Sequence, residues 1–138
     1  MGAWDYGIFD DDTAYDFFEE IKENPHAFFL ASFQNIIHEP YPITDDAHAV
    51  LVSAAYMDNL INGSFYRNEN EELEDISNVN QFQLLYPALE VDDLKDLAIQ
   101  ALKKVLSEGS ELNELWMENE ELYPKWRGQV ERLIEKFK

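Results

Sequence analysis

Residues 93–107 read DLKDLAIQALKKVLS and have the clearest periodicity in the chain. The apolar residues recur every three or four positions, which places them on one face of an α-helix. Lysines near the end suit the negative end of the helix dipole, and Gly109 follows as a terminating glycine. We therefore predict an amphipathic helix here, capped at its start by Asp92 or Asp93.

The same spacing recurs on both sides of this stretch. Pro25 suits the first turn of another helix, and Thr44, Asp45 or Asp46 can cap a further one that ends before Gly63. No segment shows the strict alternation of a half-buried strand. The predicted helices span approximately residues 12–23, 25–38, 44–62, 79–85, 93–107, 110–116 and 124–137. We predict an all-α fold, a compact single-domain bundle of about five to seven helices.

The composition supports one folded domain over residues 1–138. Hydrophobic residues make up 46% of the chain and aromatic residues 14%, enough to form a core. We expect Trp4 and Phe9 to pack on the helices, so that the opening of the chain is an ordered loop. The polar residues 64–77, in contrast, are expected to form a mobile surface loop. The predicted unit is a single acidic helical domain.

The formal net charge is −19 and is unevenly distributed. Residues 1–94 contain 20 of the 29 acidic residues and only two basic ones, Lys22 and Arg67. Residues 95–138 are nearly balanced, with 9 acidic and 8 basic residues. Such a field repels phosphate backbones and attracts a basic protein, which argues against nucleic-acid binding. The alternative is that the charge only keeps a small domain in solution.

Five aspartates near the N-terminus are the candidate partner-binding residues: Asp5, Asp10, Asp11, Asp12 and Asp16. An ordered loop loses less entropy on binding than a mobile one, which favours this cluster as the contact for a partner's arginines. The cluster could instead cap and solvate the first helix, or hold a cation. Its spacing lacks the mid-loop glycine and final glutamate of a calcium-binding EF-hand, so we predict no metal site.

No pattern of catalytic residues is present. The chain has no cysteine, which excludes thiolate nucleophiles and disulfides, and no serine lies in a Gly-x-Ser-x-Gly motif. Asp45 and His48 have the three-residue spacing of helical di-metal sites, but such sites need a second copy of the motif. We interpret His48 as part of an exposed helix start. No catalytic, cofactor-binding or metal-binding residue is predicted.

Two sets of motifs lie near the ends of the sequence. The N-terminal set is Gly2-Ala3-Trp4, Gly7, Phe9, Asp12, Ala14 and Asp16. The C-terminal set is Ser110-Glu111-Leu112, Leu115-Trp116 and Trp126-Arg127. In order and spacing these motifs resemble a bacterial family known as domain of unknown function 4259. Asp5 stands where the family usually has glycine, and Asp11 where it has asparagine. The resemblance supports the fold and implies no activity.

Three functions remain open from the sequence. The first is a cytoplasmic binding domain for a basic protein, such as an immunity-type inhibitor of a basic bacterial toxin. The second is a housekeeping interaction or scaffold domain, and the third is a carboxylate-based enzyme, with or without a metal. The first twenty residues lack the basic start and apolar run of a signal peptide, and no apolar run is long enough to cross a membrane. We therefore expect a cytoplasmic protein.

Overall fold

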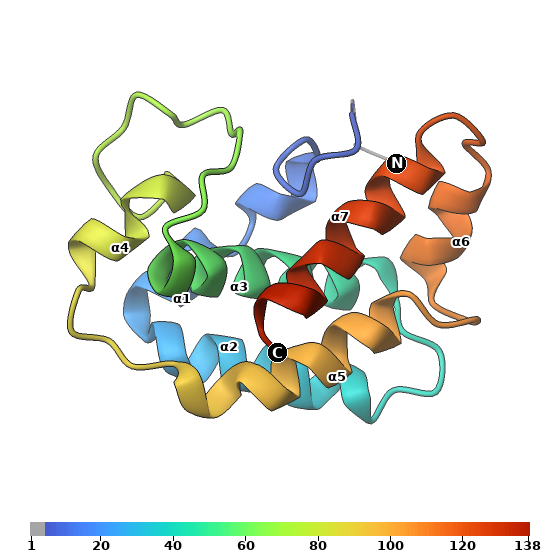
Figure 1. Ribbon diagram of the computed structural model, residues 1–138, viewed down its shortest axis with the longest axis horizontal. Helices are drawn as coiled ribbons and strands as arrows, with labels where there is room; N and C mark the ends of the chain where they lie inside the picture. Colours follow the sequence, from blue (N-terminus) through green and yellow to red (C-terminus); the bar gives the residue numbers. More distant parts are fainter. Residues whose placement is uncertain (1–4) are drawn as a thin grey trace.

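Helix α3 (Thr44–Asn62) lies at the centre of the fold. Its residues from 50 to 59 are all buried, on every side of the helix. A helix that is buried on every side must be surrounded by other elements of the protein. Figure 1 shows α3 running through the middle of the molecule. The remaining helices are arranged around it.

The computed structural model describes residues 5–138, and within that range the chain forms seven α-helices, three 3-10 turns and no β-strand. The elements are η1 (Asp12–Tyr15), α1 (Phe18–Glu23), α2 (Pro25–Ile37), α3 (Thr44–Asn62), η2 (Val79–Gln81), α4 (Phe82–Leu85), η3 (Asp92–Leu94), α5 (Lys95–Val105), α6 (Glu111–Met117) and α7 (Tyr123–Lys136). The predicted all-α bundle is confirmed.

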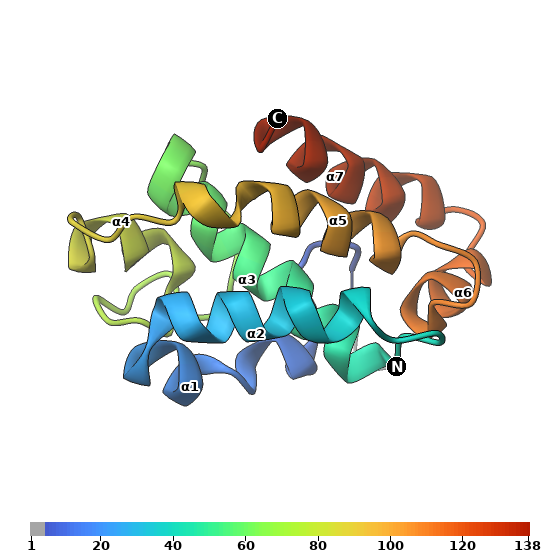
Figure 2. The same cartoon turned by 90° about the horizontal axis from the view of Figure 1, so that it is seen from below.

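Helices α2 and α5 lie side by side and pack against α3 (Figure 2). Helix α7 packs on α3 and α5, and α6 packs on α7 near the start of α3. Helix α1 covers α2, while η2 and α4 pack on α3 at the opposite end from α6. The buried apolar side chains of these elements form one core.

The N-terminal ends of three predicted helices differ from expectation in capping or in division. The helix expected over residues 93–107 begins as η3, and α5 follows from Lys95 with no side-chain cap from Asp92 or Asp93. The expected first helix is divided into η1 and α1, and its cap is Asp11, whose Oδ1 accepts a hydrogen bond from Thr13 N. Helix α3 has no cap from Thr44, Asp45 or Asp46. Instead Oε1 of Glu111, at the start of α6, accepts a hydrogen bond of 2.9 Å from Thr44 N. A distant carboxylate therefore replaces a local cap, which the local sequence could not indicate.

The N-terminal loop is docked on the helices through Phe9, which is 1% exposed. The Phe9 ring lies 6.2 Å from the rings of Tyr15 and Tyr56 and 5.9 Å from that of Tyr66. The hydroxyl of Tyr15 also donates to the Phe9 carbonyl at 2.6 Å. The expected burial of Phe9 is confirmed, whereas Trp4 lies outside the described residues.

Residues 64–77 are tied to the rest of the molecule at many points. The side-chain amide of Asn80 bonds to both the N–H and the carbonyl of Tyr66, and Asn78 donates to the carbonyls of Glu71 and Leu73. Tyr56 donates to the carbonyl of Ile76, which is buried. The expected mobile loop is thus a segment whose backbone is held by asparagine and tyrosine side chains.

None of the helices among residues 5–138 combines the length and the hydropathy needed to cross a membrane.

Candidate functional site

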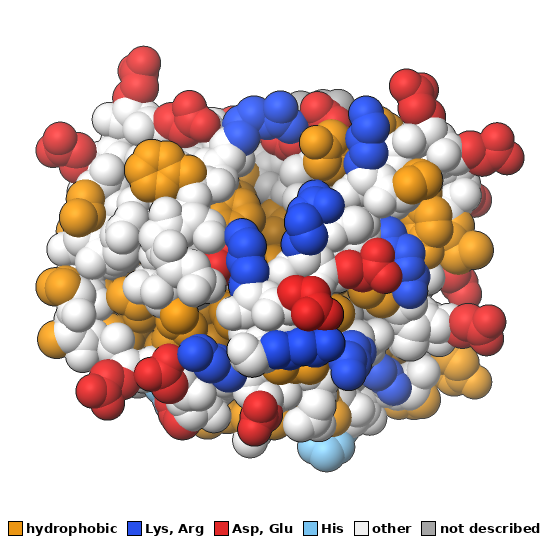
Figure 3. All heavy atoms as spheres, viewed as in Figure 1, with side chains coloured by type: hydrophobic (Ala, Val, Ile, Leu, Met, Phe, Trp, Pro, Cys, Tyr) orange, Lys and Arg blue, Asp and Glu red, His pale blue; other side chains and the backbone are white. Residues whose placement is uncertain are grey.

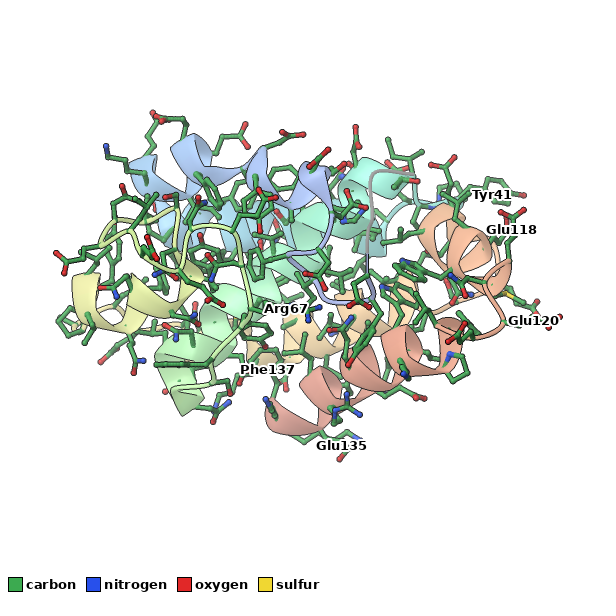
Figure 4. All side chains as sticks on the ribbon, turned by 90° about the horizontal axis from the view of Figure 1, so that it is seen from above. Tyr41, Arg67, Glu118, Glu120, Glu135 and Phe137 are labelled. Carbon is green, nitrogen blue, oxygen red and sulfur yellow. The ribbon has the colours of Figure 1, made fainter. Side chains whose placement is uncertain are left out.

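The candidate residue Asp10 is a buried carboxylate with an internal partner. Its side chain is 4% exposed and forms an ion pair with the guanidinium of Arg67, whose Nε lies 3.3 Å from Oδ1. Asp5 meets the same guanidinium, with Oδ2 3.1 Å from Nη2. Arg67 is 62% exposed and lies beside the N-terminal loop (Figure 4). The two carboxylates therefore hold one guanidinium at the surface.

Gly7 allows Asp10 to turn inward. Its backbone N–H donates to Asp10 Oδ2 at 3.0 Å, which closes a tight turn. A Cβ atom at position 7 would lie 2.5 Å from the same oxygen, closer than non-bonded atoms approach. Any side chain there would displace the Asp10 carboxylate. The glycine is thus required for the close approach that orients Asp10 toward Arg67.

Asp11 is buried as well, and it faces His48 of α3. The distance from Asp11 Oδ2 to His48 Nε2 is 3.4 Å, and both side chains are 5% exposed. Neither ring nitrogen of His48 has a hydrogen-bond partner among the described residues. Burial lowers the pKa of His48 and outweighs the nearby carboxylates of Asp11, Asp45 and Asp16, which raise it. The interpretation of His48 as part of an exposed helix start is corrected: this histidine is a core residue.

The five candidate aspartates do not form one exposed acidic face. Asp10 and Asp11 point inward, because the first holds Arg67 and the second caps η1 beside His48. Asp5 is occupied by Arg67, and only Asp12 and Asp16 are exposed on η1 and just after it. The sequence pattern could not separate these roles, since all five carboxylates lie within twelve residues.

Asp58 of α3 is a second buried carboxylate, and it binds Lys136 of α7. Its side chain is 0% exposed and accepts hydrogen bonds from Tyr66 Oη at 2.6 Å, Asn62 Nδ2 at 2.7 Å and Lys136 Nζ at 3.0 Å. Burial raises the pKa of Asp58, but these hydrogen bonds outweigh burial and hold the pKa below its usual value. Asp58 therefore stays ionised and fixes Lys136 near the end of α7.

The positions of Arg67 and Lys136 define a cleft that the sequence analysis did not anticipate. It has a volume of about 350 Å³ and lies between the N-terminal loop, the segment 65–67 and α7. Its basic side chains are Arg67, Arg132 and Lys136. Figure 3 shows Lys and Arg side chains gathered around a hollow on this face. One signal was available: Arg67 is one of only two basic residues before position 95.

A second depression lies over α1 and the end of α4. It has a volume of about 500 Å³, and its apolar lining residues, which we call its floor, are Phe18, Ile76, Leu85 and Tyr86. Its charged lining residues, which are all exposed and which we call its rim, are Glu19, Glu74, Asp75 and one amine, that of Lys22. We call this depression the acidic groove. All its lining residues belong to the acidic part of the chain, residues 1–94.

The acidic groove is held in shape by its own hydrogen bonds. Asp75 Oδ1 accepts a hydrogen bond of 3.0 Å from Ser77 N and another from the Ser77 hydroxyl. These two bonds lower the pKa of Asp75. Asn70 Nδ2 donates to the Ser77 carbonyl at 3.1 Å. One wall of the groove is therefore both ordered and ionised at neutral pH, and Leu85 remains 44% exposed beside it.

Residues 5–138 contain no group of three or more His, Asp or Glu side chains arranged to hold a metal ion. The carboxylates of the N-terminal loop are directed instead to Arg67, to His48 and to backbone N–H groups. The sequence left open a cation site at these aspartates. Among the described residues, each inward-facing carboxylate has a partner from the protein itself.

Comparison with known proteins identifies the family. The sequence matches the family described as "Domain of unknown function (DUF4259)" over residues 2–129, which is nearly the whole chain. No curated protein and no solved structure matches it. The match covers the N-terminal loop with Asp10, helices α1 to α6 and the first half of α7. The chain therefore belongs to the DUF4259 family.

Proposed function

We propose that this protein is a cytoplasmic binding domain that recognises a basic segment of another protein through the acidic groove. The observation that carries the proposal is the pairing of an apolar floor with an acidic rim in one depression. An apolar floor gives a partner's side chain a place to be buried, and the carboxylates select for lysine or arginine beside it.

Charge complementarity favours a basic partner over other ligands. The rim has three carboxylates against the single amine of Lys22, and the whole chain carries a net charge of −19. A basic protein is attracted to such a field before contact, which increases its association rate. The same field repels a phosphate backbone, so nucleic acid is not the proposed partner.

The size of the groove fits a short segment of a partner. A volume of about 500 Å³ accepts a few side chains, and the exposed Leu84 adds apolar surface next to Leu85 of the floor. A segment with an apolar anchor flanked by lysine or arginine satisfies both the floor and the rim. Within this proposal, an immunity-type inhibitor of a basic bacterial toxin is the narrower form, because an inhibitor benefits from rapid association.

The test is affinity purification from the native host with three baits, followed by mass spectrometry. The baits are the unaltered protein, a groove variant with Glu19→Gln and Glu74→Gln, and a matched control with Glu118→Gln and Glu120→Gln. The control removes the same charge near α6, at the other end of the molecule from α4 (Figure 4). A basic protein should be recovered by the first and third baits and be depleted with the groove variant.

The association rate of the purified partner then tests the mechanism. The groove variant should lower the rate by roughly tenfold and the control variant much less, and rising salt should lower it further. Lys22→Gln removes the only amine of the rim and should raise the rate. A recovered partner as acidic as this protein, or an equal effect of the groove and control variants, would refute the proposal.

A further inference from the structure

The cleft between the N-terminal loop and α7 has a charge arrangement opposite to that of the acidic groove. Its three basic side chains, Arg67, Arg132 and Lys136, come from two separate parts of the chain. The nearby carboxylates of Asp10 and Asp58 lie behind them, 4% and 0% exposed. The cations are therefore presented to solvent, while the buried carboxylates fix their positions.

Two of the cations are held by these buried carboxylates. Arg67 is bound by Asp10 and Asp5, yet its side chain is 62% exposed. Lys136 is bound by Asp58 and is 43% exposed. Burying an ionised carboxylate costs free energy unless it is paired with a cation. Asp10 and Asp58 are both paired in this way, so the positions of Arg67 and Lys136 are fixed. Side chains held in this way lose little entropy when they bind a ligand.

The third cation, Arg132, differs from the other two in its pairing. None of the carboxylates among residues 5–138 forms an ion pair with it. Gly128 lies one turn earlier on α7, and a Cβ atom there would be only 3.3 Å from Arg132 Nη1. The glycine therefore leaves space for the guanidinium to lie back along the helix. The unpaired guanidinium faces the same cleft as Arg67 and Lys136.

We infer that this cleft binds a small oxyanion, a phosphate or carboxylate group of a soluble molecule, through Arg67, Arg132 and Lys136. A guanidinium can donate two parallel hydrogen bonds to such a group, and Arg132, which forms no ion pair within residues 5–138, is placed to do so. Arg67 already bonds to Asp10 and Asp5 through Nε and Nη2, so it contributes Nη1, and Lys136 contributes its amine. At about 0.15 M salt the Debye length is roughly 8 Å, so distant acidic residues are largely screened. The cations that line the cleft then determine binding, despite the net charge of the chain.

The test is isothermal titration of the full chain with pyrophosphate and, separately, with citrate. The variant Arg132→Gln removes the guanidinium that has no carboxylate partner within residues 5–138 and leaves the Arg67–Asp10 and Lys136–Asp58 ion pairs intact. Lys103→Gln is the matched control, since it removes one exposed charge from α5, outside the cleft. We expect Arg132→Gln to weaken binding by about tenfold or more and Lys103→Gln to leave it nearly unchanged.

The two anions distinguish the chemical source of the ligand. Tighter binding of pyrophosphate assigns a phosphate group, and tighter binding of citrate assigns a carboxylate. No binding of either anion at millimolar concentration, or an equal loss in Arg132→Gln and Lys103→Gln, would overturn the inference. These measurements involve no protein partner and no residue of the acidic groove, so their outcome is independent of the proposed function.

Discussion

The acidic groove and the cleft lined by Arg67, Arg132 and Lys136, here called the basic cleft, both depend on carboxylates, but in opposite ways. In the groove, Glu19 and Glu74 are exposed and form the rim themselves. In the cleft, Asp10 and Asp58 are buried and each holds a cation that faces solvent. The same residue type thus presents negative charge in one place and supports positive charge in the other.

This difference matters for what each region can bind. Exposed, unpaired carboxylates act over a distance and suit the steering of a large partner. Cations held by buried carboxylates have fixed positions and suit a small ligand that needs several donors at once. Because Phe9 contacts both Tyr15, next to the groove-forming α1, and Tyr66, beside the cleft, the N-terminal loop supports both regions.

The largest expected effect comes from the residue on which both regions depend. Phe9→Ala should lower the free energy of unfolding by about 3–5 kcal/mol, because it leaves a cavity among Tyr15, Tyr56 and Tyr66. Urea denaturation measures the change. Phe65→Ala is the control: this aromatic side chain is 78% exposed, and its removal should change stability by less than about 0.5 kcal/mol. Similar losses in the two variants would contradict the docking of the loop.

A smaller loss is expected when the buried carboxylate of the cleft is removed. Asp58→Asn should lower the free energy of unfolding by about 2–3 kcal/mol, since Tyr66 and Lys136 lose a charged acceptor. In the groove, Glu74→Gln should change it by less than about 0.5 kcal/mol, because the side chain is exposed. Urea denaturation of both variants compares the two uses of a carboxylate directly. Equal losses of stability in Asp58→Asn and Glu74→Gln would contradict the distinction between buried and exposed carboxylates.

Mild acid should also destabilise the protein through His48. Burial keeps the pKa of His48 below that of an unfolded histidine, so the unfolded state takes up a proton first as the pH falls. The contribution of the neutral histidine to stability is therefore fully present above about pH 7, and it declines as the pH falls below about 6.5, the pKa of an unfolded histidine. The melting temperature measured between pH 7.5 and 5.5 tests this. The variant His48→Gln should show a flatter dependence, and an equal slope in both proteins would contradict it.

The fold could largely be predicted from the sequence, because helical periodicity is a local property. The helices now labelled α2, α3, α5 and α7 were expected within a few residues of their observed bounds. The start of α3 at Thr44 was predicted, but its cap could not be, since the capping carboxylate belongs to Glu111, 67 residues away. The division of the first helix into η1 and α1 was also missed, and its cap is Asp11, whose side chain accepts a hydrogen bond from Thr13 N.

The site was harder to predict because it depends on which carboxylates turn inward. Asp10 and Asp12 are alike in the sequence, and only Gly7 and Arg67 distinguish Asp10 in the fold. Asp58 could have been noticed, because it lies four residues after Ala54 and thus on the apolar face of its helix. Charge counts along the chain did not reveal that Arg67 joins α7 to form a basic cleft.

The smallest expected effect concerns Asp12 and Asp16, the two candidate aspartates that are exposed. It tests most directly whether buried and exposed carboxylates have different roles. Asp12→Asn and Asp16→Asn should each change the free energy of unfolding by less than about 0.5 kcal/mol, because neither carboxylate forms an ion pair within residues 5–138. Asp10→Asn should destabilise the protein more than either, since the Arg67 guanidinium then loses a charged acceptor.

Chemical denaturation of the three variants gives the order of stability. If Asp12 or Asp16 belongs to the surface that meets a basic partner, its substitution should appear in the association rate and not in stability. A loss above about 1 kcal/mol in Asp12→Asn would show that exposure does not separate these carboxylates. Burial would then no longer explain why residues adjacent in the sequence serve different regions of the molecule.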